Sequence, residues 1–236
     1  MDNALHDVMA ELVKEASPRR RRELLEAHRE LWHPATVATF YAEVLRLLHV
    51  DVQQAERVAR ATSLVANRIR DDASRAAGLR ALGHIHYRKR KYEASVEYYR
   101  QSLAIYQRLG DHREAGRTLS SSLQSLIYLG RYPEALEHAR LARQIFEGLG
   151  DRLRLARLDA NLGNIFYRQD RFAEALELYS APIRPSSKSA SRRMSPFRSR
   201  ILPPARSASM ISDKLWQLTK RPAPTAWNTT CRCWWP

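Results

Sequence analysis

The pattern of apolar and polar residues repeats along this chain with a period of forty residues. In each unit an aromatic residue is followed, three positions later, by a small side chain, and the triplet Leu-Gly-Asp recurs at Leu109 and Leu149. A period in this range is typical of a solenoid, in which each unit leaves an apolar face that its neighbour covers, so it favours a binding surface over a catalyst. The repeated positions are Tyr92 and Ser95, Tyr132 and Ala135, and Phe172 and Ala175.

Residues 1–34 precede the repeats and are predicted to form a helical lead-in. Apolar residues at helical spacing predict an amphipathic helix over 3–16. Ser17 suits an N-cap, and Pro18 suits the first helical position, where its missing N–H costs nothing. A second helix is therefore expected to run from there to about Leu31.

Residues 35–180 are predicted to form the solenoid. The first part, 35–72, follows the later units only loosely and reads as a degenerate repeat that caps the stack. Three clearer units follow, each with a first helix, a short turn and a second helix. Glycine followed by aspartate marks the junctions at Gly110-Asp111 and Gly150-Asp151, because glycine suits a helix end and aspartate an N-cap. The units are expected near 73–110, 111–150 and 151–180, the last one truncated.

The residue types at fixed positions of each unit resemble those of the tetratricopeptide repeat. The signature of that family has a bulky residue, Leu-Gly and an aromatic residue in the first helix, then an aromatic residue, Ala and a last aromatic residue in the second. The resemblance covers roughly residues 35–180, although the period of forty exceeds the family's usual length of about 34. It implies an all-α solenoid of helix-turn-helix repeats. The second unit departs from the signature with Ser122-Leu123 in place of Leu-Gly and with Ala139 in place of the last aromatic. The matching residues are Leu79, Leu82-Gly83, His86, Tyr92, Ser95 and Tyr99, and Leu162-Gly163, Phe166, Phe172, Ala175 and Tyr179.

The resemblance also implies a binding site. In the family, the first helix of each pair lines a concave groove that usually holds a peptide of a partner protein. Asparagine offers donors and acceptors to a peptide backbone and arginine pairs with carboxylates, so the implied ligand is an acidic or carboxylate-ended peptide. The implied groove residues are Arg80, His84, Tyr87 and Arg88; Arg117, Ser121, Gln124 and Tyr128; and Arg157, Asn161, Asn164, Tyr167 and Arg168.

The composition changes sharply after residue 180. Residues 181–236 hold eleven Lys and Arg against one acidic residue, Asp213, and so carry +10 of the formal net charge of +15. A basic segment rich in Ser and Pro predicts a disordered tail. It could also be a basic arm that binds phosphate backbones, in which case the chain would be a basic transcriptional regulator or nucleic-acid binder that uses the tail together with Arg19 to Arg22.

A third interpretation of the tail is a shifted reading frame between Tyr179 and Arg184. The second helix of the last unit has begun at that point, and prolines then replace its continuation, at a cost of about 3 kcal/mol each in a helix interior. The last apolar face would stay uncovered, which predicts self-association through the last helix. The chain could then also be the regulatory fragment of a larger signalling protein or of a caspase-like protease.

Other chemistry finds little support in the sequence. The run Arg19 to Arg22 could form a nucleic-acid patch, but its interleaving with Glu23 and later glutamates favours a solvated helix face, and nucleic acid is not the favoured partner. His84 and His86 are two apart and point to different faces of a helix, so no metal or other cofactor is predicted. No catalytic motif, signal sequence or membrane span is recognised, so a non-enzymatic protein of the cytosol is expected.

Overall fold

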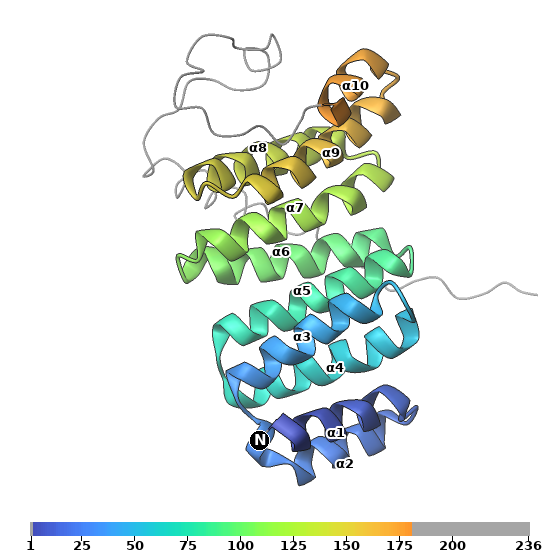
Figure 1. Cartoon of the computed structure of the whole chain (residues 1–236), viewed down its shortest axis with the longest axis vertical. Coiled ribbons are helices and arrows are strands. Elements are labelled where there is room, and N and C mark those ends of the chain that lie inside the picture. Colours follow the sequence, from blue (N-terminus) through green and yellow to red (C-terminus); the bar gives the residue numbers. More distant parts are fainter. Residues whose placement is uncertain (1, 181–236) are drawn as a thin grey trace, which may run out of the picture. The chain divides into compact units, whose positions relative to one another are not determined.

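The computed structural model describes residues 2–180, and tail residues 181–236 lie outside the described part. Within it, every element is helical and successive α-helices from α3 onward pack against each other (Figure 1). The predicted all-α solenoid is therefore confirmed. The helices are α1 Asp2–Lys14, α2 Pro18–Ala27, the 3₁₀ turn η1 Arg29–Leu31, α3 Pro34–Leu47, α4 Val52–Ile69, α5 Asp72–Arg88, α6 Tyr92–Arg108, α7 His112–Tyr128, α8 Tyr132–Gly148, α9 Arg152–Arg168 and α10 Phe172–Ser180.

The junctions between helix pairs are built as the sequence predicts. The side chain of Asp111 accepts a hydrogen bond from the N–H of Glu114 at 3.0 Å and caps α7, and Asp151 caps α9 in the same way. Gly110 and Gly150 follow the preceding helices with φ of +69° and +65°, a left-handed conformation that costs glycine nothing. These local signals fix where each pair begins.

Within each pair, a small residue on one helix receives a large one from the other. A Cβ atom added to Gly83 of α5 would lie 2.7 Å from the ring of Tyr99 on α6, so only glycine fits there. Gly163 faces Tyr179 in the same way. The middle pair reverses the sizes, with Leu123 and Ala139 at the equivalent positions, both buried. The departure of the second unit from the family signature is thus a volume-conserving exchange.

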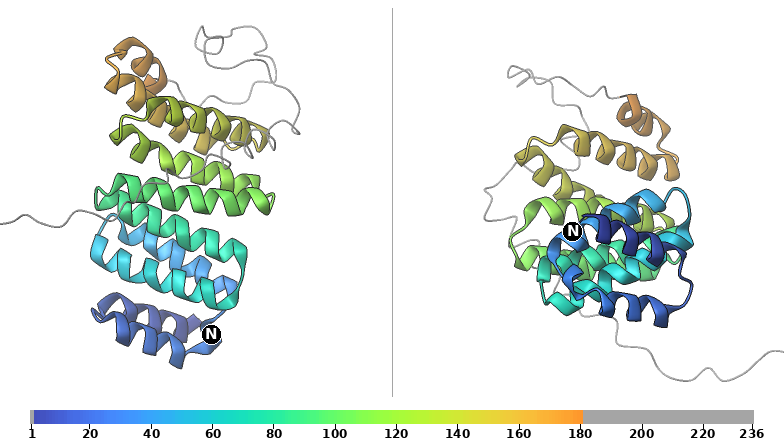
Figure 2. Two further views of the ribbon diagram at one scale, coloured as in Figure 1. Left: turned by 180° about the vertical axis from the view of Figure 1, so that it is seen from behind. Right: turned by 60° about the horizontal axis from the view of Figure 1, so that its bottom comes forward.

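The lead-in helices pack on the first pair, with α1 and α2 both against α4 (Figure 2). Leu12 and Leu25 share one apolar core with Phe40 of α3, and Arg57 of α4 donates to the carbonyl oxygen of Val13 at 2.7 Å, near the end of α1. The pair α3 and α4 is therefore covered by the lead-in and does not itself cap the stack. The second lead-in helix is also shorter than predicted, because α2 ends at Ala27.

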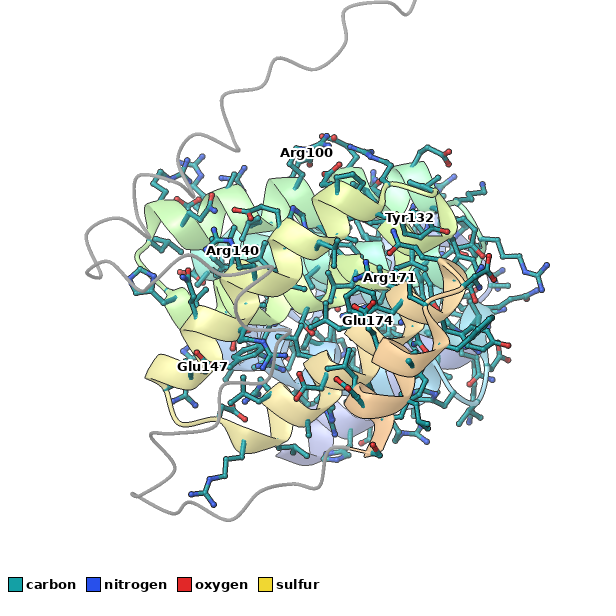
Figure 3. The ribbon with its side chains drawn as sticks, turned by 90° about the horizontal axis from the view of Figure 1, so that it is seen from above. Arg100, Tyr132, Arg140, Glu147, Arg171 and Glu174 are labelled. Atoms are coloured by element: carbon teal, nitrogen blue, oxygen red, sulfur yellow. The ribbon has the colours of Figure 1, made fainter. Side chains whose placement is uncertain are left out.

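The first helices of successive pairs also contact one another, α3 with α5, α5 with α7, and α7 with α9. They form one surface, which we call the first-helix face. At the far end, the described part of α10 leaves Phe172, Leu176 and Tyr179 exposed. Beside them Arg171 forms an ion pair with Glu174 at the start of α10, where both side chains are visible (Figure 3).

Candidate functional site

Arg80 of α5 does not lie open on the first-helix face, as the resemblance implied. Its side chain is buried, and its Nε donates to the Tyr41 hydroxyl of α3 at 2.8 Å. Nη2 donates to Oε2 of Glu114 of α7 at 2.5 Å, and Nη1 donates to the Glu114 carbonyl oxygen at 3.3 Å. Arg80 therefore joins three successive first helices and is not available to a peptide, which corrects its assignment.

Glu114 is held charged at the centre of this arrangement. Burial by itself would raise the pKa of its carboxyl, but the ion pairs with Arg80 and with Arg117 at 2.7 Å keep the pKa below its usual value. The charges of Glu114 and Arg80 are thus paired with each other, as charges removed from water must be. Neither Tyr41 nor Glu114 was predicted from the sequence, because the only signal was their place in units adjacent to Arg80.

His84 is half-buried, and both of its ring nitrogens are engaged. One ring nitrogen, Nε2, lies 3.1 Å from the Tyr41 hydroxyl, and the other, Nδ1, lies 2.9 Å from the Tyr99 hydroxyl. Burial, together with the positive charges of Arg80 and Arg117, lowers the pKa of His84 to about 3. The imidazole is therefore neutral at pH 7 and joins two tyrosines, and its part in peptide binding stays a prediction.

Several aromatic residues lie near the helix turns, and we call them the aromatic row. The rings of Tyr92 and Tyr128 stack at a centroid distance of 4.7 Å, and Tyr87 lies 6.1 Å from Tyr92. The guanidinium of Arg168 lies 4.5 Å above the Tyr128 ring, in a cation–π contact. Tyr128 is 45% exposed, and Tyr167, which contacts Phe172, is 59% exposed. The row thus presents open aromatic surface to a ligand. Tyr92 was predicted only as the first residue of a helix.

The amide side chains of α7 and α9 are oriented by hydrogen bonds. Gln124 donates from Nε2 to Oδ1 of Asn161 at 2.9 Å, and the Tyr179 hydroxyl donates to Oδ1 of Asn164 at 2.7 Å. Within residues 2–180, neither asparagine Nδ2 has a hydrogen-bond partner. Both asparagines therefore keep N–H donors for another molecule.

The remaining residues of the predicted site differ in their availability. Arg88 and Arg157 are exposed, whereas Arg117 is half-buried in its ion pair with Glu114. Ser121 donates its hydroxyl to the Arg117 carbonyl oxygen of its own helix, so it offers little to a ligand. The open part of the first-helix face therefore lies mainly on α7 and α9.

Two general features of the described residues bear on function. No helix within residues 2–180 combines the length and apolar character needed to cross a bilayer. In the same part of the chain, no three His, Cys, Asp or Glu side chains come together as a possible metal site.

Replacing Glu114 with alanine should lower the free energy of unfolding by about 3 kcal/mol, because Arg80 would stay buried and charged without its carboxylate. Replacing both residues, as Arg80→Met with Glu114→Ala, should cost less than Glu114→Ala alone. Urea denaturation of Glu114→Ala, Arg80→Met and the double variant measures both effects. If the loss of unfolding free energy in the double variant equals the sum of the two single losses, the ion pair between Arg80 and Glu114 is contradicted.

Lowering the pH from 7 to 5 should destabilise the fold through His84. The unfolded imidazole gains its proton below about pH 6.5, whereas the folded one resists protonation down to about pH 3. Because the unfolded state binds more protons in this window, the free energy of unfolding falls as the pH is lowered. The stabilisation that comes from neutral His84 is fully present above pH 6.5 and decreases by about 2 kcal/mol between pH 7 and 5.

The measurement is urea denaturation at several pH values. His84→Gln should show a slope of unfolding free energy against pH that is shallower by about 1.4 kcal/mol per unit below pH 6. An unchanged slope would show that His84 protonates normally in the fold.

Comparison with known proteins agrees with this architecture. A family model described as tetratricopeptide repeat matches residues 74–148 and 124–181. The first match begins in α5 and the second extends to the end of α10, so together they cover all three clear helix pairs. No curated protein matches the chain. Residues 74–181 are therefore similar to tetratricopeptide repeats.

Proposed function

We propose that this chain binds an acidic, carboxylate-ended segment of a partner protein, and that this segment lies across α7 and α9. The repeat family supports an interaction scaffold in general. The kind of segment and its position on the first-helix face are our proposal. The chain would act by binding and not by catalysis, and the cytosol stays its predicted compartment.

The observation that carries the proposal is the pair of oriented asparagines. The oxygens of Asn161 and Asn164 are held by Gln124 and Tyr179, which leaves their Nδ2 groups as donors one helical turn apart. A peptide in extended conformation needs donors of this kind for its backbone carbonyl groups. Because the donors are already oriented, little side-chain entropy is lost on binding.

The charges near the asparagines favour an acidic ligand. Arg157 and Arg168 on α9 are both exposed, and Arg157 has no ion pair or hydrogen bond within the described residues. A guanidinium can hold a carboxylate through two parallel hydrogen bonds. The Arg168 guanidinium also rests on Tyr128, so part of its position is fixed before binding.

The aromatic row supplies the apolar part of the surface. Tyr128 and Tyr167 expose large rings beside the arginines. Aromatic and arginine side chains contribute most of the energy in protein interfaces. An apolar side chain next to the terminal carboxylate would pack on these rings.

Self-association through the last helix stays a second prediction. Leu176 of α10 is 67% exposed, and Phe172 and Tyr179 lie exposed on the same helix. An apolar surface of this kind can be covered by another protein molecule. The peptide proposal does not require self-association, and of the residues that it uses only Tyr179, which orients Asn164, lies on α10.

Replacing Asn161, Asn164 and Arg168 together with alanine should raise the Kd for a carboxylate-ended peptide at least tenfold, which is about 1.4 kcal/mol. Donors to the backbone and a charge for the carboxylate are both removed. A library of fluorescent peptides with acidic residues and a free carboxyl end provides the ligand, and fluorescence anisotropy provides the Kd. Amidation of the carboxyl end should weaken binding to the unchanged protein.

The matched control is Arg100→Ala on the second helix α6, whose side chain lies away from the first-helix face (Figure 3). This control should keep the original Kd. Helicity of both variants is checked by circular dichroism. Equal affinity of the triple variant and the control would refute the proposed binding face.

A further inference from the structure

A separate pocket lies between the lead-in helices and the first pairs, on the side chains of α2, α4, α5 and α6. Its volume is about 610 Å³, which is within the range of about 300–1,000 Å³ of small-molecule sites. None of the residues proposed to bind the peptide lines it. We call it the arginine pocket, after Arg21, Arg22, Arg60 and Arg68, which line it.

One part of the arginine pocket is apolar and flat. Leu25 of α2 and Ile85 of α5 are fully buried beneath it. The ring of His86 stacks on the ring of Tyr98 at 4.9 Å, with an angle of 26° between the planes. Burial, and then the positive charge of Lys91, lowers the pKa of His86, so this ring is neutral at pH 7. A planar apolar group would pack against such a surface.

The other part of the pocket is strongly positive. Glu56 is the only acidic residue among the described residues that line it, and its carboxylate is already paired with Arg60 at 2.8 Å and with Lys89 at 2.7 Å. Arg68 is paired outside the pocket, with Glu26 at 2.5 Å. Arg22 has no ion pair or hydrogen bond within residues 2–180. The positive charge of the pocket therefore exceeds its negative charge.

The position of Arg21 makes this excess costly. Its side chain is buried, and Nη1 donates to the carbonyl oxygens of Glu15 and Ala16 at 2.7 and 2.8 Å. Burial, followed by the positive charges of Arg57 and Arg60, lowers the pKa of its guanidinium. An anion in the pocket would relieve this repulsion.

Arg21 and Arg22 also lie near the N-terminal end of α2, which is unfavourable for positive charge. The first turn of α2 contains no acidic residue, although the positive end of the helix dipole favours Asp and Glu there. Arginines at this end lower the stability of the isolated helix. Their presence beside a cavity is explained if the helix end and the guanidinium groups together hold an anion.

We propose that the arginine pocket binds a small planar anion, an aromatic ring that carries a carboxylate, sulfonate or phosphate group. The ring packs against His86 and Tyr98, and the anionic group lies between Arg22 and Arg60. The free guanidinium of Arg22 supplies the new ion pair. This site is independent of the proposed peptide-binding face.

The test is fluorescence titration of the full chain with 8-anilinonaphthalene-1-sulfonate, followed by displacement with indole-3-acetate or its neutral amide. We expect saturable binding of one probe molecule, and at least tenfold more effective displacement by the acid than by the amide. Arg22→Glu should weaken probe binding at least tenfold. Arg152→Glu, which makes the same charge change at an exposed position on α9, should not.

Two further variants make the outcome decisive. Asn67→Trp places a large ring at an exposed position on the rim of the pocket and should block the probe. Leu176→Glu, on the exposed apolar surface of α10, should leave probe binding unchanged. Equal probe affinity of Arg22→Glu and the original protein, equal displacement by acid and amide, or loss of binding only in Leu176→Glu would overturn the proposal. Circular dichroism confirms that each variant is folded.

Discussion

The buried ion pair of Arg80 is the constraint on which the first-helix face depends. A charge removed from water must be paired and hydrogen-bonded, and Arg80 meets this condition only by reaching Tyr41 on one side and Glu114 on the other. These contacts fix three successive first helices relative to one another. They also engage Arg80 and His84 of α5, since His84 is hydrogen-bonded to the same tyrosine. Apart from Arg88, the exposed residues of the predicted site lie on α7 and α9.

Local features of the fold were predictable from the sequence, and contacts between helix pairs were not. The forty-residue period and the junction at Gly110-Asp111 locate helices because capping and helix termination depend on neighbouring residues in the chain. The burial of Arg80 and the hydrogen bond of His84 depend instead on Tyr41, a residue of an earlier pair. The helical spacing in the sequence therefore placed Arg80 wrongly on an open surface. The arginine pocket was missed for the same reason, because it forms only where the lead-in packs on α4.

The two proposed sites lie on different parts of the molecule and differ in the kind of surface that they offer. The peptide site uses exposed tyrosines and arginines on first helices, whereas the arginine pocket is a cavity with an apolar surface and a positive wall. Both favour anions, in keeping with the net charge of +5 on residues 1–180. They differ in the shape that they accept, since an extended segment suits an open face and a single ring suits a cavity of this size. A ligand in the pocket would also join α2 to α4, α5 and α6.

The most direct test of the account is the position of a bound partner peptide. A photoreactive p-benzoylphenylalanine is placed at position 167 on α9 and, in a second protein, at position 100 on α6, and each protein is irradiated with a selected carboxylate-ended peptide. Tyr167 is exposed beside the oriented asparagines, so a crosslink is expected at position 167 and none at position 100. A crosslink at position 100 alone would contradict the assignment of the first-helix face as the binding surface.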